Sequence, residues 1–316
     1  MKLSRRLALI LPLVAGSAAG ALWWRSSSRP DSVKLQNRLE APLPAPAGPM
    51  AVFHIGHSLV NRDMPAMLAQ LAGDGHRHDS QLGWGTPLKA HWGDEPINGF
   101  ETENDHPRFR SAPEAVESGD YDAIVLTEMV EIRDALRYFD SPLYLERWTQ
   151  KAVSARPDVR LYLYETWHQL DDPEGWLTRL DADLQRYWLD GLAKPALAKL
   201  PPDARLHIIP AGQVLAQFVR NVEAAGGVGN VTQRTDLFAR NADGSQDKIH
   251  LNDLGNYLVA LVHYTVLYHQ SPVGLPYELL RADGSPANAP APETARLMQE
   301  TVLEVVRRMP ITGVSI

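Results

Sequence analysis

A serine near the start of the chain has the surroundings expected of a nucleophile. It lies in Gly56-His57-Ser58-Leu59, directly after the apolar run 51–55. We expect this run to be a strand, and a glycine at its end permits a tight turn that exposes the Ser58 hydroxyl at the edge of a sheet. The backbone N–H of Ser58 is then available to a developing oxyanion. The lipase-type nucleophile elbow is excluded, because it requires a second glycine where this chain has Val60.

An acid and a histidine near the other end of the chain have the spacing of a base and its orienting partner. They lie in Asp247-Lys248-Ile249-His250, which we expect to form a turn before the last long helix. A carboxylate three residues before a histidine can accept its Nδ1–H and leave Nε2 facing outward. A serine, a histidine and an acid together form the serine-hydrolase constellation, which is recognised by roles and not by chain order. The pattern therefore predicts Ser58 as nucleophile, His250 as base and Asp247 as the orienting acid.

Alternating strand and helix signals predict the elements that position these residues. Strands are expected over 51–55, 77–82, 121–127, 159–164 and 205–209, and helices over 64–72, 143–155, part of 174–199, 212–225, 254–269 and 293–309. Continuous apolar strands that alternate with helices indicate an α/β fold whose parallel sheet is covered on both faces. In such sheets the chemistry gathers at the carboxyl ends of the strands.

The two blocks together resemble the SGNH hydrolases, also called the GDSL esterase/lipase family, over about residues 50–270. Gly56-His57-Ser58-Leu59 is similar to the first block of that family, and Asp247-Lys248-Ile249-His250 to its last. Gly83-Trp84-Gly85 fits the second block. The resemblance implies a flavodoxin-like three-layer α/β/α sandwich, a mechanism without a cofactor, and an oxyanion hole that includes the N–H groups of Ser58 and Gly85.

The chain departs from the family pattern at two places. His57 stands where the first block commonly has Asp or Asn. The third block should supply an asparagine side chain to the oxyanion hole, but the strand that ends near Thr127 continues into Glu128. An ionised glutamate only accepts hydrogen bonds, so it would donate only if kept protonated. The third donor is left open between Thr127, Glu128, Asn98 and Asn104.

Histidines in the first third of the domain raise a rival hypothesis of a metal-dependent hydrolase. They are accompanied by several aspartates, but no compact zinc motif such as H-E-x-x-H is present. Scattered histidines are more often surface or hydrogen-bonded core residues, so we expect no metal site. The histidines concerned are His54, His57, His76, His78, His91 and His106.

Two tryptophans flank the expected oxyanion loop. Trp84 and Trp92 would provide an aromatic floor for a sugar ring or an acyl group, and both are predicted to bind substrate. Trp148, Trp176 and Trp188 lie in expected helices and are assigned to the core.

The composition of the 316 residues is that of a globular protein, with 44% hydrophobic and 22% charged residues. The formal net charge is −7, and no basic block follows the extreme N-terminus, which argues against a nucleic-acid partner. The chain contains no cysteine. Disulfides, thiolate metal sites and a cysteine nucleophile are therefore excluded.

The N-terminal segment has the pattern of an export signal. Basic residues precede the apolar run 7–24, so we expect 1–24 to be a signal peptide or a membrane anchor, and the protein to be periplasmic or extracellular. Serines and prolines over 25–49 predict a linker without a core of its own, and the hydrolase-like domain is expected to span 50–316.

These features predict an exported serine esterase that removes a short acyl group, possibly from a carbohydrate, through an acyl-enzyme. An O-acetyltransferase that uses the same site on a glycan is one alternative. A non-catalytic envelope protein that binds glycan in the cleft is another, and the missing third-block asparagine is the feature that keeps it open.

Overall fold

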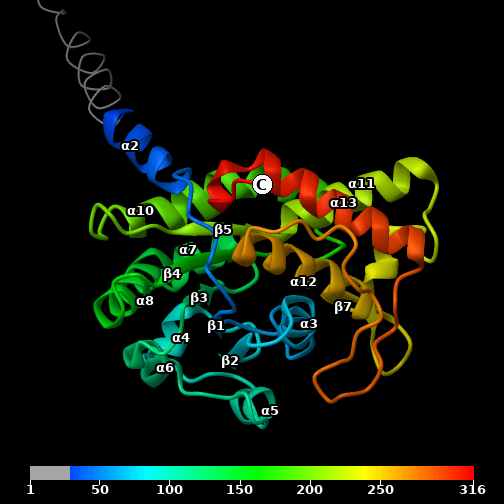
Figure 1. Cartoon of the computed structure of the whole chain (residues 1–316), viewed down its shortest axis with the longest axis horizontal. Helices are drawn as coiled ribbons and strands as arrows, with labels where there is room; N and C mark the ends of the chain where they lie inside the picture. The colour runs from blue at the N-terminus through cyan, green and yellow to red at the C-terminus, as the bar shows by residue number, and fades with distance from the viewer. Residues whose placement is uncertain (1–28) are drawn as a thin grey trace, which may run out of the picture.

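The computed structural model describes residues 29–316, and its centre is a five-stranded parallel sheet in the order β2-β1-β3-β4-β5 (Figure 1). The strands are β1 (Ala51–Ile55), β2 (Arg77–Gln81), β3 (Ala123–Leu126), β4 (Arg160–Glu165) and β5 (His207–Pro210). The chain starts at β1, moves out to β2 and then returns past β1 to β3, so the connections reverse direction between β1 and β3. This order is that of flavodoxin-like folds, which bind ligands at the reversal. The predicted fold class is confirmed.

Successive residues of the strands point into two separate hydrophobic cores. In β1, Val52 belongs to one core, and Phe53 and Ile55 belong to the other. The first core contains residues of α3 (Asp63–Ala72), α9 (Trp176–Asp183), α11 (Ala211–Ala225), α12 (Asp253–Tyr268) and α13 (Pro292–Arg308). The second contains residues of α6 (Ala112–Ser118), α7 (Ile132–Tyr138), α8 (Ser141–Ala155), the π-helical η1 (Leu184–Ala193) and α10 (Lys194–Leu197). The helices thus form a layer on each face of the sheet, as Figure 1 shows.

The expected strands and long helices are all present, whereas several short elements were not predicted. Short helices have too few turns to show a clear hydrophobic period. The additional elements are α2 (Arg29–Leu39), α4 (Leu88–Trp92), α5 (Phe100–Asn104), α6, α7, η2 (Arg234–Leu237), β6 (Phe238–Arg240), β7 (Gln246–Leu251) and η3 (Pro310–Thr312). The expected turn at 247–250 lies within β7, which pairs antiparallel with β6.

The segment before Met50 differs from the expected linker. Residues 29–39 form helix α2, and the Leu39 side chain is fully buried in the second core. The Arg38 guanidinium donates hydrogen bonds to the carbonyls of Leu197, Pro201 and Ala204. The folded unit therefore includes residues that the sequence assigned to a linker, because serine and proline content does not reveal a surface to which a segment docks.

The predicted signal or anchor, residues 1–24, lies outside the described residues. Within 29–316, no helix combines the length and the apolar character needed to cross a membrane.

Many histidines are wholly or partly buried in or near the sheet and its covering helices. Burial lowers the pKa of each, to about 4 for seven of those named here and well below the usual value for His54. His54 lies 6.0 Å from His263, measured between ring centroids, and neither ring nitrogen of His54 has a hydrogen-bond partner. The set is His54, His57, His76, His78, His91, His207, His263 and His269.

We expect the free energy of unfolding to fall as the pH decreases from about 6.5 to about 4. In this interval the histidines of the unfolded chain bind protons and those of the folded chain do not, and each such group contributes about 1.4 kcal/mol per pH unit. Two buried carboxyls act in the opposite direction, because burial raises the pKa of Glu128 to about 7 and that of Glu165 to about 8. The histidines outnumber them. Urea titrations at several pH values measure this slope, and His54→Phe should make it shallower; an unchanged slope in that variant would contradict the assignment.

Candidate active site

The turn that carries Ser58 is held by the ring of the preceding residue. His57 is fully buried, its Nε2–H donates to the Glu128 carbonyl over 2.9 Å, and its Nδ1 accepts the N–H of Leu59 over 3.3 Å. Burial lowers the pKa of His57 to about 4, which keeps the ring neutral and Nδ1 able to accept. His57 therefore joins the turn after β1 to the loop after β3. The sequence marked this position only as a departure from the family pattern.

A second buried histidine holds the other side of the same turn. His91 of α4 donates from Nε2 to the Gly56 carbonyl over 2.8 Å, and its Nδ1 accepts from Gln81 over 2.9 Å. A side chain at Gly56 would not fit, because a Cβ there would lie 2.6 Å from the Thr127 methyl group. The glycine is thus required by close packing between the turn and β3.

The three predicted catalytic side chains are hydrogen-bonded in series. The two oxygens of Asp247 divide their partners: Oδ1 accepts the N–H groups of Ile249 and His250 over 2.8 and 2.9 Å, and Oδ2 lies 2.8 Å from Nδ1 of His250. Because a carboxylate only accepts, His250 carries its proton on Nδ1. Its Nε2 is then an acceptor, and it lies 3.0 Å from Oγ of Ser58. The structure thus brings together residues from opposite ends of the domain.

Asp247 is held as a carboxylate. Burial raises its pKa, but the N–H groups of His250 and Ile249 and the His250 ring outweigh that effect, and the net pKa lies below the usual value. An ionised acid at this point fixes the orientation of His250 and stabilises the imidazolium that a proton transfer would form.

Two backbone N–H groups are free to receive an oxyanion. Ser58 and Gly85 both line the cavity at the serine, and within residues 29–316 neither backbone N–H has a protein acceptor. Gly85 adopts a φ of +53°, in the left-handed region that favours glycine. Both residues lie where the sequence placed them, and their N–H groups are suited to a developing negative charge.

None of the four candidates for the third donor is available. The Thr127 hydroxyl is buried and donates to the Tyr164 carbonyl over 2.8 Å. The Glu128 carboxyl is buried away from the cavity, where it accepts N–H groups of Leu88 and Met129.

The two asparagines are equally unavailable. The amide of Asn104 is bonded to the backbone of Leu82 and to the Phe100 carbonyl. Asn98 is absent from the cavity wall. The position of a residue in the sequence does not determine whether its side chain points into the cavity. For this reason the expectations for the third donor are wrong.

The cavity at Ser58 has a volume of about 1060 Å³ and includes one of the two predicted tryptophans. Trp84 is 52% exposed, and its indole N–H donates to Glu103 over 2.7 Å. Trp92 lies elsewhere: it packs edge-on against Trp148, with ring centroids 4.9 Å apart, and is absent from the cavity wall. The prediction for Trp92 is therefore wrong, because α4 turns its side chain toward α8.

The histidines of the rival metal hypothesis are dispersed. His57 and His91 hold the Ser58 turn, while His54 is enclosed on the opposite side of β1 from the second core. Within the part of the chain that the structure describes, no three His, Cys, Asp or Glu side chains are grouped to hold a metal ion.

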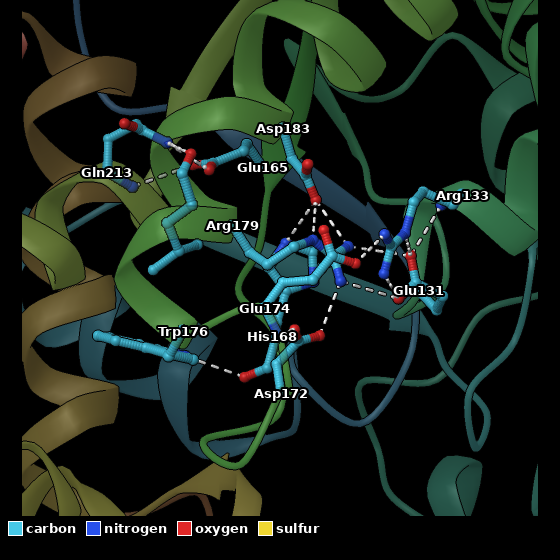
Figure 2. A network of polar contacts seen from close by, with 11 residues as sticks. Glu131, Arg133, Glu165, His168, Asp172, Glu174, Trp176, Arg179, Asp183 and Gln213 are labelled. Carbon is cyan, nitrogen blue, oxygen red and sulfur yellow. Dashed lines mark hydrogen bonds and ion pairs between the residues drawn. The ribbon is translucent and has the colours of Figure 1, made fainter.

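A buried arginine braces the wall of the cavity formed by the loops after β3 and β4. Figure 2 shows Arg179 of α9 between Glu131, Asp172 and Asp183, whose carboxylate oxygens lie 3.0, 2.7 and 2.6 Å from guanidinium nitrogens. Glu131 and Asp172 line the cavity, whereas Arg179 is only 2% exposed. Burial raises the pKa of Glu131, but the hydrogen bonds from Arg133 and Arg179 have a larger effect in the opposite direction, and the net pKa is about 2.

One solved structure among those compared with this chain agrees with the fold. No family model matches the chain, and no curated protein matches its sequence. A crystal structure of a DUF4886 family protein from Bacteroides uniformis is similar, with a TM-score of 0.51 and 14% identity, covering 81% of this chain and 94% of that one. A second structure, provisionally named a platelet activating factor from Streptococcus pneumonia, has a TM-score of 0.36 and 15% identity, over 80% of this chain and 100% of that one. The first likeness supports the three-layer fold.

We expect Arg179→Met to lower the free energy of unfolding by about 3–5 kcal/mol, because it leaves several carboxylates without their buried cation. Arg296→Met is the matched control: Arg296 also pairs with an acid four residues later, but its side chain is 77% exposed. Its loss should change the free energy of unfolding by less than about 1 kcal/mol. Urea unfolding of both variants measures the difference, and equal effects would contradict a bracing role.

Proposed function

We propose that this protein is a serine esterase, and that it belongs to the SGNH hydrolases that its sequence blocks resemble. The observation that carries the proposal is the hydrogen-bonded series Asp247–His250–Ser58, with 2.8 and 3.0 Å between its members. It stands beside two free N–H groups in a cavity large enough for a small ester. The preferred substrate is a short acyl ester, possibly on a carbohydrate, and the proposed location is outside the cytoplasm.

The proposed reaction has two steps. Ser58 Oγ attacks the ester carbonyl while His250 Nε2 takes the hydroxyl proton, and the N–H groups of Ser58 and Gly85 bind the oxyanion. As the tetrahedral intermediate collapses, the bond to the alcohol breaks and His250 returns the proton to the leaving oxygen. Water then attacks the acyl-enzyme, His250 accepts its proton, and the carboxylic acid leaves with Ser58 restored.

We expect Ser58→Ala to abolish hydrolysis of 4-nitrophenyl acetate by the purified protein, because Ser58 provides the one hydroxyl bonded to His250 within residues 29–316. Ser271→Ala, at an exposed serine, is the control and should retain full activity. Equal activity in wild type and Ser58→Ala would remove Ser58 as nucleophile. No activity in either folded protein, with acyl transfer to an added glycan also absent, would favour the glycan-binding alternative.

Asp247→Asn tests the orienting role separately. The amide keeps the shape but can donate to His250, which favours the wrong tautomer, and kcat should fall by about 10⁴. Circular dichroism of the variant checks that the protein remains folded. A decrease of less than about tenfold would show that His250 does not depend on Asp247 for its orientation.

A further inference from the structure

Two asparagines from distant parts of the chain form an amide pair in the cavity wall. Asn61 follows Ser58 by three residues, and Asn256 lies in the first turns of α12. Nδ2 of Asn61 lies 2.9 Å from Oδ1 of Asn256. Both residues line the cavity at Ser58.

Backbone groups decide which atoms of this pair donate. Oδ1 of Asn61 accepts the N–H groups of Asp63 and Met64 over 2.8 and 3.1 Å, at the start of α3. An atom that receives two N–H groups must be the oxygen, so the Asn61 nitrogen is the donor that faces Asn256. The Asn256 atom that faces it is then the oxygen. The Asn256 amide is thus oriented by a chain of bonds that begins at the helix start.

This orientation leaves the nitrogen of Asn256, a residue of the cavity wall, without a protein partner among the described residues. Asn256 is 5% exposed, and within residues 29–316 no hydrogen bond involves its Nδ2. This nitrogen is not fully enclosed by the protein, so solvent or a ligand can reach it. An accessible amide N–H without a protein acceptor is left to water or to a ligand, so it can donate to an acceptor that enters the cavity.

The charges of the wall favour an uncharged acceptor. Five carboxylates line the cavity, and no lysine or arginine of the described residues does so. Those of Asp63 and Glu103 form no ion pair within the described residues. An anionic ligand would be repelled here. The five are Asp63, Glu103, Glu131, Asp171 and Asp172.

An aromatic surface in the same wall is held in place. The Trp84 ring lies against Gly99, where a Cβ would approach its ring atoms to 2.3 Å, and its N–H is bonded to Glu103. The ring is thus fixed while about half of its surface stays exposed. Such a surface suits the apolar face of a sugar ring.

We propose that Asn256 is a substrate-binding residue whose Nδ2–H donates to an uncharged oxygen in the alcohol part of the ester, and that Asn61 is its positioning residue. The ligand class is a neutral acetylated sugar. Its ring lies against Trp84, and its ring oxygen, or an oxygen of an acetyl group that is not cleaved, accepts from Asn256. This inference rests on the proposed function and adds the substrate class and the residue that selects it.

The experiment compares two acetyl esters that differ in the alcohol. Glucose pentaacetate offers several acceptor oxygens, whereas 4-nitrophenyl acetate offers a flat leaving group without a sugar ring. Asn256→Leu keeps the size of the side chain and removes the donor. We expect the ratio of kcat/KM for the sugar ester to that for the aryl ester to fall about tenfold, mainly through KM. Asn256→Asp, which keeps the oxygen that Asn61 contacts, should lower the same ratio.

Asn221→Leu is the matched control. Asn221 lies on α11, away from the cavity, and its amide is bonded to Thr301 and Gln217. In this variant the ratio of kcat/KM for the sugar ester to that for the aryl ester should equal the ratio of the wild type. An unchanged ratio in both Asn256 variants, with Ser58-dependent hydrolysis intact, would overturn the role of Asn256 and leave the esterase proposal standing.

A binding measurement separates this inference from the proposed function. Calorimetry of Ser58→Ala with glucose pentaacetate should show binding that weakens about tenfold when Asn256→Leu is added. Such binding, together with a wild-type protein that hydrolyses neither ester, would retain the role of Asn256 and reject the esterase. Binding that is absent, or that does not depend on Asn256, would reject the sugar site.

Discussion

The hydrogen bond between His57 and the Glu128 carbonyl is the contact on which the geometry of the site depends. It joins the turn after β1 to the loop after β3, at the point where the connections of the sheet reverse. The ring performs this role only while neutral, because a protonated Nδ1 would face the N–H of Leu59. Burial provides that neutrality, and His91 holds the other side of the turn in the same way. Ser58 is thus presented to His250 by two histidines that take no part in proton transfer.

The charged side chains around the cavity form two layers of opposite sign. Carboxylates face the cavity, and the cations that balance some of them, above all Arg179, lie behind the wall. In the proposed reaction, positive potential at the ester carbonyl would come from backbone N–H groups, which are fixed in place and would need no reorganisation. The same arrangement disfavours anionic substrates and leaves room for the uncharged acceptor inferred at Asn256.

The expectations that differ from the structure share a physical cause. Thr127, Glu128 and Trp92 lie at the places in the fold that the sequence predicts, but their side chains point away from the cavity. The local backbone conformation at each residue decides this direction. The linker assigned to 25–49 contains a docked helix, because a distant surface accepts Leu39 and Arg38. Composition and spacing describe what a segment is able to form alone, and they do not describe what covers it.

The sequence by itself determined the alternation of strands and helices, the flavodoxin-like class and the positions of Ser58, Gly85, Asp247 and His250. These follow from local periodicity and from short blocks whose residues act through their immediate neighbours. Only the tertiary structure decided that His57 and His91 hold the turn, that Arg179 braces the wall, and that Asn61 and Asn256 pair in the cavity wall. Each of these depends on a contact between segments far apart in the chain, and such contacts leave no spacing by which a sequence reveals them.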